Sequence, residues 1–159
     1  MGAPFHSVDR KCEDAIATII EALRGANLVG YTIYKGFSGA ELVPNRIHVF
    51  CDSAQPEIAG ESDVFTGNWR CHVIIEVASN YQDKTRDERE LANAELFDIL
   101  LDQSNLAELI NNQGGVADFT AYGGEQGEGE CFTPDMIENE PTGHEYIKRL
   151  TGTLYCRPS

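Results

Sequence analysis

Residues 67–81 read GNWRCHVIIEVASNY and are the longest strand-like run in the 159-residue chain. Successive side chains of a β-strand point to opposite faces of its sheet. One face of this run then carries Trp69, Cys71, Val73, Ile75 and Val77. The other carries Arg70, His72, Ile74, Glu76 and Ala78. We therefore expect the central strand of a sheet with one apolar face covered by helices. Cys71 and His72 are consecutive, so they cannot be ligands in one site.

The other elements follow from hydrophobic periodicity and from the residues that begin and end helices and strands. Helices are expected at about 8–24, 85–101 and 105–110, and strands at 31–35, 46–51, 69–78, 117–122 and 146–156. In the order α-β-β-β-α-α-β-β, strands do not alternate one for one with helices. This predicts one α+β domain over residues 1–159, with a mostly antiparallel sheet of about five strands and two main helices packed on one face.

The two main helices carry the clearest local signals. In the first, apolar residues recur at steps of three and four, which makes one stripe of Val8, Cys12, Ile16, Ile19, Ile20 and Leu23. Thr85 and Glu88 have the spacing of a capping box and should begin the second helix. Its inner face is expected to hold Leu91, Ala94, Phe97, Leu100 and Leu101.

The charge is strongly negative, with 26 acidic and 12 basic residues and a formal net charge of −14. It argues against a protein that grips nucleic acid or an anionic membrane, because both need clustered Lys and Arg. Segments 52–68 and 123–145 hold four and seven carboxylates and no Lys or Arg, so they supply −11 of the net charge. We expect both to be long acidic loops. We also expect no transmembrane helix and no signal peptide.

Five cysteines, at positions 12, 51, 71, 131 and 156, form no CxxC pair. Without an export signal, reduced and buried thiols are expected. Zinc is the main alternative, because Cys and His are its preferred ligands. Cys51 and Cys71 could be neighbours on the apolar face, but they supply two ligands where four are needed. His48 and Cys51 are excluded as a pair, because their spacing puts them on opposite faces.

Two further kinds of site are weaker hypotheses. Cys131 and His144 could form a nucleophilic pair, but nearby carboxylates would raise the pKa of the thiol instead of lowering it. The acidic residues of segment 123–145 could bind calcium, but they lack the EF-hand spacing, and a solvated acidic loop is the simpler interpretation. We therefore predict no catalytic, cofactor-binding or metal-binding residues.

The sheet face away from the helices has a different character. Alternation in the strands at 46–51, 69–78 and 146–156 gathers basic and aromatic side chains on it, namely Arg46, His48, Arg70, His72, Arg149 and Tyr155. A mildly basic sheet face on a protein with acidic loops is suited to binding further copies of the same chain. These six residues are our candidates for a subunit interface.

Several stretches in sequence order resemble the tail terminator and related head–tail connector proteins of long-tailed bacteriophages. The resemblance rests on CEDAIATIIEALRG, PNRIHVFC, NWRCHVIIEVA, RDERELANAELFDILL, SNLAELI and RLTGTLYCRP, which together span most of the chain. It implies a structural virion protein and not an enzyme. Members of that family form a ring, commonly a hexamer, that caps the tail tube and joins it to head completion proteins while DNA passes through the hole.

The resemblance leads to the following expectations. The chain would assemble in the host cytoplasm and reside at the tail–head junction, with itself, the tail tube protein and head completion or neck proteins as partners. DNA would pass an acidic lumen without specific binding. The candidates for a lumen or docking loop are Glu125, Glu128, Glu130, Glu138 and Glu140. The alternatives are a neck or stopper protein, a tube-forming subunit, or a small cytosolic metal- or partner-binding domain.

Overall fold

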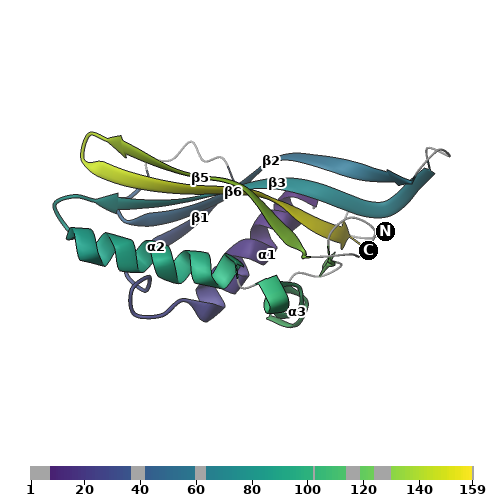
Figure 1. The fold of residues 1–159 in the computed structure, drawn as a ribbon, viewed down its shortest axis with the longest axis horizontal. Coiled ribbons are helices and arrows are strands. Elements are labelled where there is room, and N and C mark those ends of the chain that lie inside the picture. Colours follow the sequence, from purple (N-terminus) through teal and green to yellow (C-terminus); the bar gives the residue numbers. More distant parts are fainter. Residues whose placement is uncertain are drawn as a thin grey trace.

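The long run at 67–81 is the core of strand β3, as the sequence predicts. The computed structural model describes residues 8–36, 42–59, 64–101, 103–113, 119–123 and 130–158. Its elements in chain order are α1 (Val8–Leu23), β1 (Thr32–Lys35), β2 (Arg46–Ala59), β3 (Val64–Asn80), α2 (Arg86–Leu101), α3 (Gln103–Gln113), β4 (Phe119–Ala121), β5 (Phe132–Thr142) and β6 (Glu145–Pro158). Figure 1 shows the helices on one side of the curled sheet.

The α+β class is confirmed, whereas the predicted strand order and pairing are only partly right. The sheet has six strands in the order β1-β2-β3-β6-β4, and β5 also pairs with β6. β1 and β2 are parallel, and the other pairs are antiparallel, so the sheet is mixed. The additional strand, β5, lies inside a segment that we expected to be a loop.

The hydrophobic core lies between the helices and the apolar face of the sheet. The predicted stripe of α1 is confirmed at Cys12, Ile16, Ile19 and Ile20, which are fully buried. The apolar face of β3 is also confirmed, with Trp69 packed at its edge. The largest fully buried side chains are Phe132, Ile16, Ile19, Ile20, Leu28, Ile47, Ile75, Leu96, Leu100, Leu106, Leu150 and Leu154.

Helix α2 begins where predicted but turns a different face to the core. The backbone N–H of Thr85 donates to Glu88 at 3.0 Å, and the N–H of Glu88 donates to the Thr85 hydroxyl at 3.2 Å, so the capping box is formed. The buried residues are Ala92, Asn93, Leu96 and Leu100. The predicted inner face was therefore wrong except near its end, and Leu91 is 53% exposed. Two apolar stripes overlap at Leu100, and periodicity does not rank them.

The expected acidic loop at 52–68 is largely strand. β2 and β3 pair from Arg46↔Ala78 out to Ala59↔Val64, with register shifts between Cys51 and Ser53 and between Pro56 and Ile58. Such bulges place Pro within a strand without breaking the whole ladder. Because β6 pairs with β3 only from Trp69 onward, residues 57–59 and 64–68 form a two-stranded arm. Figure 1 shows this arm extending beyond the body of the molecule.

The expected loop at 123–145 is also wrong over most of the described part. β5 occupies residues 132–142 and pairs with β6 through a two-residue turn, in which Gly143 has φ 52°. A positive φ at the first turn position favours Gly. Pro134 and the glutamates hid this strand from sequence analysis, because both residue types are rare in central strands. β5 tolerates them because β6 is the one strand of the described residues that pairs with it.

No helix in the described ranges is long and apolar enough to cross a membrane. Cys131 and His144 lie beyond opposite ends of β5, so they do not form the nucleophilic pair considered above. Burial and the charge of Glu130 raise the pKa of the Cys131 thiol to about 12. That thiol is therefore poorly suited to act as a nucleophile.

Gly152 allows β5 to pack closely against β6. A Cβ at Gly152 would lie 2.4 Å from the ring of the fully buried Phe132 and 2.8 Å from the carbonyl oxygen of Thr133. We predict that Gly152→Ala lowers the free energy of unfolding by about 1–3 kcal/mol, because the core is overpacked. Urea denaturation followed by circular dichroism measures the change.

Gly30→Ala is the matched control for this substitution. A Cβ there meets nothing within 4 Å. Its effect should stay within about 0.5 kcal/mol, as for most surface substitutions. Equal losses of stability in the two variants would contradict the close packing of Phe132 on Gly152.

Candidate functional site

The sheet face turned away from the helices is the candidate functional site, and we call it the polar face. Its members alternate with core residues along β2, β3 and β6, as the sequence predicts. In one row across the sheet, His48 is the partner of Glu76, Glu76 of Arg149, and Arg149 of Glu138 on β5. The polar face carries Arg46, His48, Phe50, Arg70, His72, Ile74, Glu76, Arg149, Thr151, Thr153 and Tyr155. All six predicted interface residues therefore share one face, while their role in subunit contacts stays a prediction.

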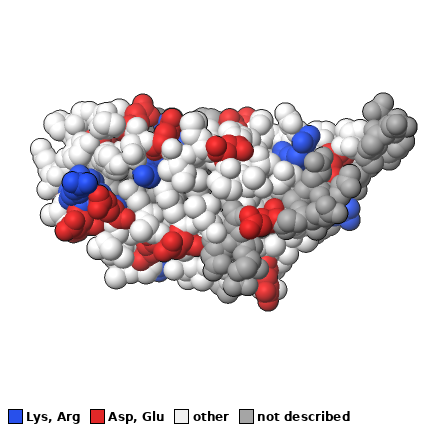
Figure 2. All heavy atoms as spheres, viewed as in Figure 1, with Lys and Arg blue, Asp and Glu red and all other residues white. Residues whose placement is uncertain are grey.

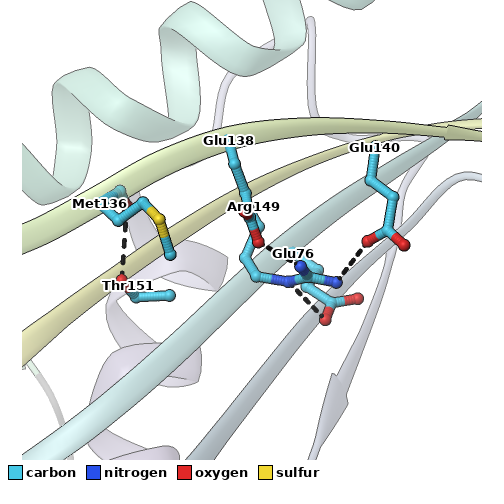
Figure 3. A network of polar contacts seen from close by, with 6 residues as sticks. All are labelled: Glu76, Met136, Glu138, Glu140, Arg149 and Thr151. Carbon is cyan, nitrogen blue, oxygen red and sulfur yellow. Dashed lines mark hydrogen bonds and ion pairs between the residues drawn. The ribbon is translucent and has the colours of Figure 1, made fainter.

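Arg149 forms the densest polar contact of this face (Figure 3). Its Nε donates to Glu76 at 3.1 Å, its Nη1 to Glu138 at 2.5 Å and its Nη2 to Glu140 at 2.9 Å. Partial burial lowers the pKa of Arg149, but the hydrogen bond to Glu138 and the charge of Glu76 outweigh it, so the pKa is raised. One guanidinium thus joins β3, β5 and β6 and remains charged.

The same contact changes the interpretation of two predicted loop residues. Glu138 and Glu140 lie on β5 and bind Arg149, so they are strand residues and not part of a docking loop. Glu130 precedes β5 and is exposed, whereas Glu125 and Glu128 lie outside the described residues. The spacing of Glu138 and Glu140 by two residues was the available signal for a strand, since it puts both on one face.

Arg46 is also engaged within the chain. It forms an ion pair with Glu145, and its side chain is only 12% exposed. The buried Nε atoms of Arg46 and Arg70 have no hydrogen-bond partner among the described residues. Of the three predicted interface arginines, Arg46 and Arg149 are therefore neutralised internally, and Arg70 lies in no described ion pair.

His72 lies between two carboxylates from neighbouring strands. Its Nδ1 is 2.7 Å from Asp52 on β2, and its Nε2 is 3.2 Å from Asp135 at the bulge of β5. Both hydrogen bonds can form together only when both ring nitrogens carry hydrogen, because a carboxylate oxygen accepts. His48 has a different setting: its Nε2 is 2.5 Å from the Gly36 carbonyl oxygen, and its ring packs on Phe50.

A hollow opens on the polar face beside His72. It is lined by Ser53, Gln55, Arg70, His72, Thr153 and Tyr155. The Tyr155 ring packs edge-on against Tyr122, with ring centroids 6.0 Å apart. At the base of the arm, the Tyr122 hydroxyl donates to the buried Glu57 at 2.9 Å. Burial and that contact raise the pKa of Tyr122 above its ordinary value, so it remains a hydrogen-bond donor.

The structure also brings together more thiols than the two, Cys51 and Cys71, that the sequence suggested as neighbours. The sulfur atoms of Cys12, Cys51 and Cys71 all lie within 4.8 Å of one another, and the Cys156 sulfur lies 3.6 Å from that of Cys71. Sequence alternation gave the correct core face for Cys51, Cys71 and Cys156. It did not show that α1 adds Cys12 to the same place.

Comparisons with known proteins do not assign the chain to a family. No protein-family model matches the chain, and no curated protein matches it. The arrangement of residues therefore carries the functional argument.

We predict that Arg149→Met lowers the free energy of unfolding by about 1–3 kcal/mol. The change leaves three neighbouring carboxylates without their shared donor, and Glu76 is only 15% exposed. Adding Glu138→Gln should recover part of the loss by removing one of the repelling charges. Thermal and urea unfolding measure both effects.

Arg86→Met is the matched control, because Arg86 also pairs with a glutamate, Glu90, but both are largely exposed. Exposed pairs of this kind contribute about 0.5 kcal/mol or less. The importance of the Arg149 contact is refuted if the two arginine variants lose stability equally.

Proposed function

We propose that this chain is a structural virion protein of a long-tailed bacteriophage. In this proposal, copies form a ring, expected to be a hexamer, at the head-proximal end of the tail tube. The ring stops tube growth by occupying the tube end, and its other side docks head completion or neck proteins while DNA passes through the hole. Its mechanism is geometric, and it uses no catalytic residue.

The projecting arm is the observation that supports this proposal most. In the arm, Ile58 pairs with Phe65 and Ala59 with Val64, and among the described residues no third strand pairs with residues 57–59 or 64–68, which extend beyond the body (Figure 1). A two-stranded ribbon alone is marginally stable in water. The arm is held at its base, where Arg157 donates to Asn68 at 2.8 Å and Tyr122 donates to Glu57. Such an arm is suited to lie on a neighbouring copy.

Strand β5 offers a surface that could receive such a contact. It pairs with β6 on one side, and among the described residues no strand pairs with its other edge. Met136 and Ile137 on this strand are 49% and 47% exposed. A contact between the arm of one copy and a different surface of the next is heterologous, and its repetition closes a ring when the rotation between neighbouring copies divides a full turn.

The charge distribution supports passage of DNA without binding. In Figure 2 the acidic atoms are spread over the face drawn, and the blue atoms of the coloured residues form no continuous patch there. Even the Arg149 contact joins one guanidinium to three carboxylates, so it is acidic overall. An acidic lumen would repel phosphates, which is the reverse of binding through counterion release.

The ion pairs on the polar face reduce the number of residues that we propose as contacts with other copies. Arg46 and Arg149 already bind carboxylates of their own chain, so charge reversal there would disturb the fold as well as an interface. Arg70 and Tyr155, beside the hollow, are better candidates for intermolecular contacts. Glu130 is the remaining described candidate for a lumen residue outside a strand.

We predict that the purified chain, alone or on added tail tubes, forms a ring and that Ile58→Asp prevents it. Ile58 lies on the arm and is 46% exposed, so a charge there should weaken an apolar contact without loss of core packing. Light scattering and electron microscopy measure the ring, and circular dichroism checks that the variant is folded. Val29→Asp, at a residue 66% exposed in the turn between α1 and β1, is the matched control.

A wild-type chain that stays monomeric and does not bind tail tubes would overturn the ring. Normal rings from Ile58→Asp would show that the arm is not the contact.

A second experiment separates the terminator from its structural alternatives. If the ring stops tube growth, phage made without this protein should carry overlong tail tubes. A neck or stopper protein would instead leave tails of normal length that fail to join heads, and loss of a tube subunit would leave no tube. Electron microscopy of the defective particles distinguishes the three outcomes.

A metal-binding domain is the remaining candidate function, and the converging thiols are the observation that favours it. A zinc-loaded monomer with no affinity for tail tubes would support this class over the ring. Zinc in an assembled ring would be compatible with both properties.

A further inference from the structure

Four cysteines from four separate elements meet beneath the apolar face of the sheet. Cys12 comes from α1, Cys51 from β2, Cys71 from β3 and Cys156 from β6. Three of these side chains are completely buried, and Cys51 is 5% exposed. The first three sulfur atoms lie within 4.8 Å of one another, and Cys71 and Cys156 are separated by 3.6 Å. Cys71 is therefore at the centre of the group.

These separations match those in a metal–thiolate centre. Zinc binds thiolate sulfur at about 2.3 Å in a tetrahedron, which places its ligand sulfurs about 3.8 Å apart. The sulfurs of Cys12, Cys51 and Cys71 all lie within 4.8 Å of one another, and the Cys71–Cys156 separation is 3.6 Å. Cys156 is not part of the mutual 4.8 Å group and is close to Cys71, so its sulfur has to turn toward Cys12 and Cys51 to complete a tetrahedron around one ion. Such a site does not need a CxxC pair, because α1 and the sheet bring cysteines that are distant in sequence close together in space.

Cys131 is a buried cysteine outside this group, and the causes of its pKa shift differ from those in the group. It is 1% exposed, and its raised pKa comes from burial and Glu130, not from another thiol. Contacts with Cys51 and Cys71, together with burial, raise the pKa of Cys12. The contact with Cys12 lowers the pKa of Cys51, but the contact with Cys71 and burial raise it to about 12.

A surface hollow borders the group at Cys51. It is lined by Asp9, Arg10, Glu13, Asp14, Lys35, Gly36, Cys51 and Asp52, so its four carboxylates exceed its two basic groups. Glu13 also accepts a hydrogen bond from the Cys51 backbone N–H at 2.9 Å, which fixes this part of β2 against α1. The excess of carboxylates in this hollow would attract a divalent cation, and the thiols are the softer ligands that zinc prefers.

We propose that Cys12, Cys51, Cys71 and Cys156 bind one zinc ion. Each sulfur that binds gives its proton to solvent, and four thiolates fill the tetrahedral coordination of the ion. With no position left for water or substrate, the site is structural and not catalytic. It would tie the N-terminal part of α1 to three adjacent strands. The proposal does not depend on the ring, and either can hold without the other.

The first test is the metal content of the full-length chain expressed with zinc in the medium and purified under reducing conditions without chelator. Mass spectrometry of the metal should find about one zinc ion per chain, the stoichiometry of a single four-ligand site. Cys71→Ser removes the central ligand and should reduce the zinc to background. Cys131→Ser is the matched control, since it changes a buried cysteine outside the group, and it should retain the zinc.

The second test uses wild-type protein, so it does not depend on the folding of a variant. Cobalt added to the chelated and reduced chain should give sulfur-to-cobalt charge-transfer bands and the intense visible bands of a tetrahedral thiolate site. Zinc should abolish these bands and raise the melting temperature of the chelated chain.

Three results would overturn the proposal. The first is a chain that contains no zinc when purified and gives no cobalt–thiolate bands. The second is a disulfide between Cys71 and Cys156 in the reduced preparation, detected by mass. The third is equal zinc content in soluble, folded Cys71→Ser and wild-type proteins. Each would identify the four cysteines as core packing or as a redox pair.

Discussion

Strand β3 pairs with β2 along one edge and with β6 along the other. Its alternating side chains face the hydrophobic core on one side and the polar face on the other. Its apolar side chains, from Cys71 to Val77, are completely buried, while His72 and Glu76 between them bind charged groups on β2 and β6. A slip of one residue would put the charged side chains into the core. The register of β3 with β2 and β6 therefore fixes the hydrophobic core, the polar face and the positions of the thiols together.

Features that depend on neighbours in sequence were predictable here, and features that depend on register or overlapping patterns were not. The α1 stripe, the Thr85–Glu88 capping box and the alternation of β3 all follow from spacing within one element. The α2 inner face failed because two apolar stripes share Leu100. β5 was missed because an edge strand tolerates Pro and Glu, and the partners of Arg149 were missed with it. The thiol cluster depends on strand register and on helix packing, which sequence spacing does not give.

The polar face also shows why net charge and local charge must be considered separately. The chain has a net charge of −14, yet two arginines of its polar face, Arg46 and Arg149, form ion pairs with carboxylates of the same chain. In these contacts the basic groups join strands to one another. Because the ion pairs are partly buried, they are stronger than ion pairs on the surface. What remains for solvent and partners is a surface on which carboxylates prevail. Each of these arginines engages at least one carboxylate, so the contacts leave the excess of acidic residues as the composition sets it.

The place of β6 in the sheet has a consequence for synthesis. β6 follows the other five strands in the chain, but it lies inside the sheet, with β3 on one edge and β4 and β5 on the other. As the chain leaves the ribosome, one edge of β3 stays unpaired until residues 145–158 emerge. β4 and β5 also have no partner strand until then. Contacts so distant in sequence form slowly, and open strand edges are prone to pair with other chains. The nascent protein is therefore most exposed to aggregation before residues 145–158 take their place in the sheet.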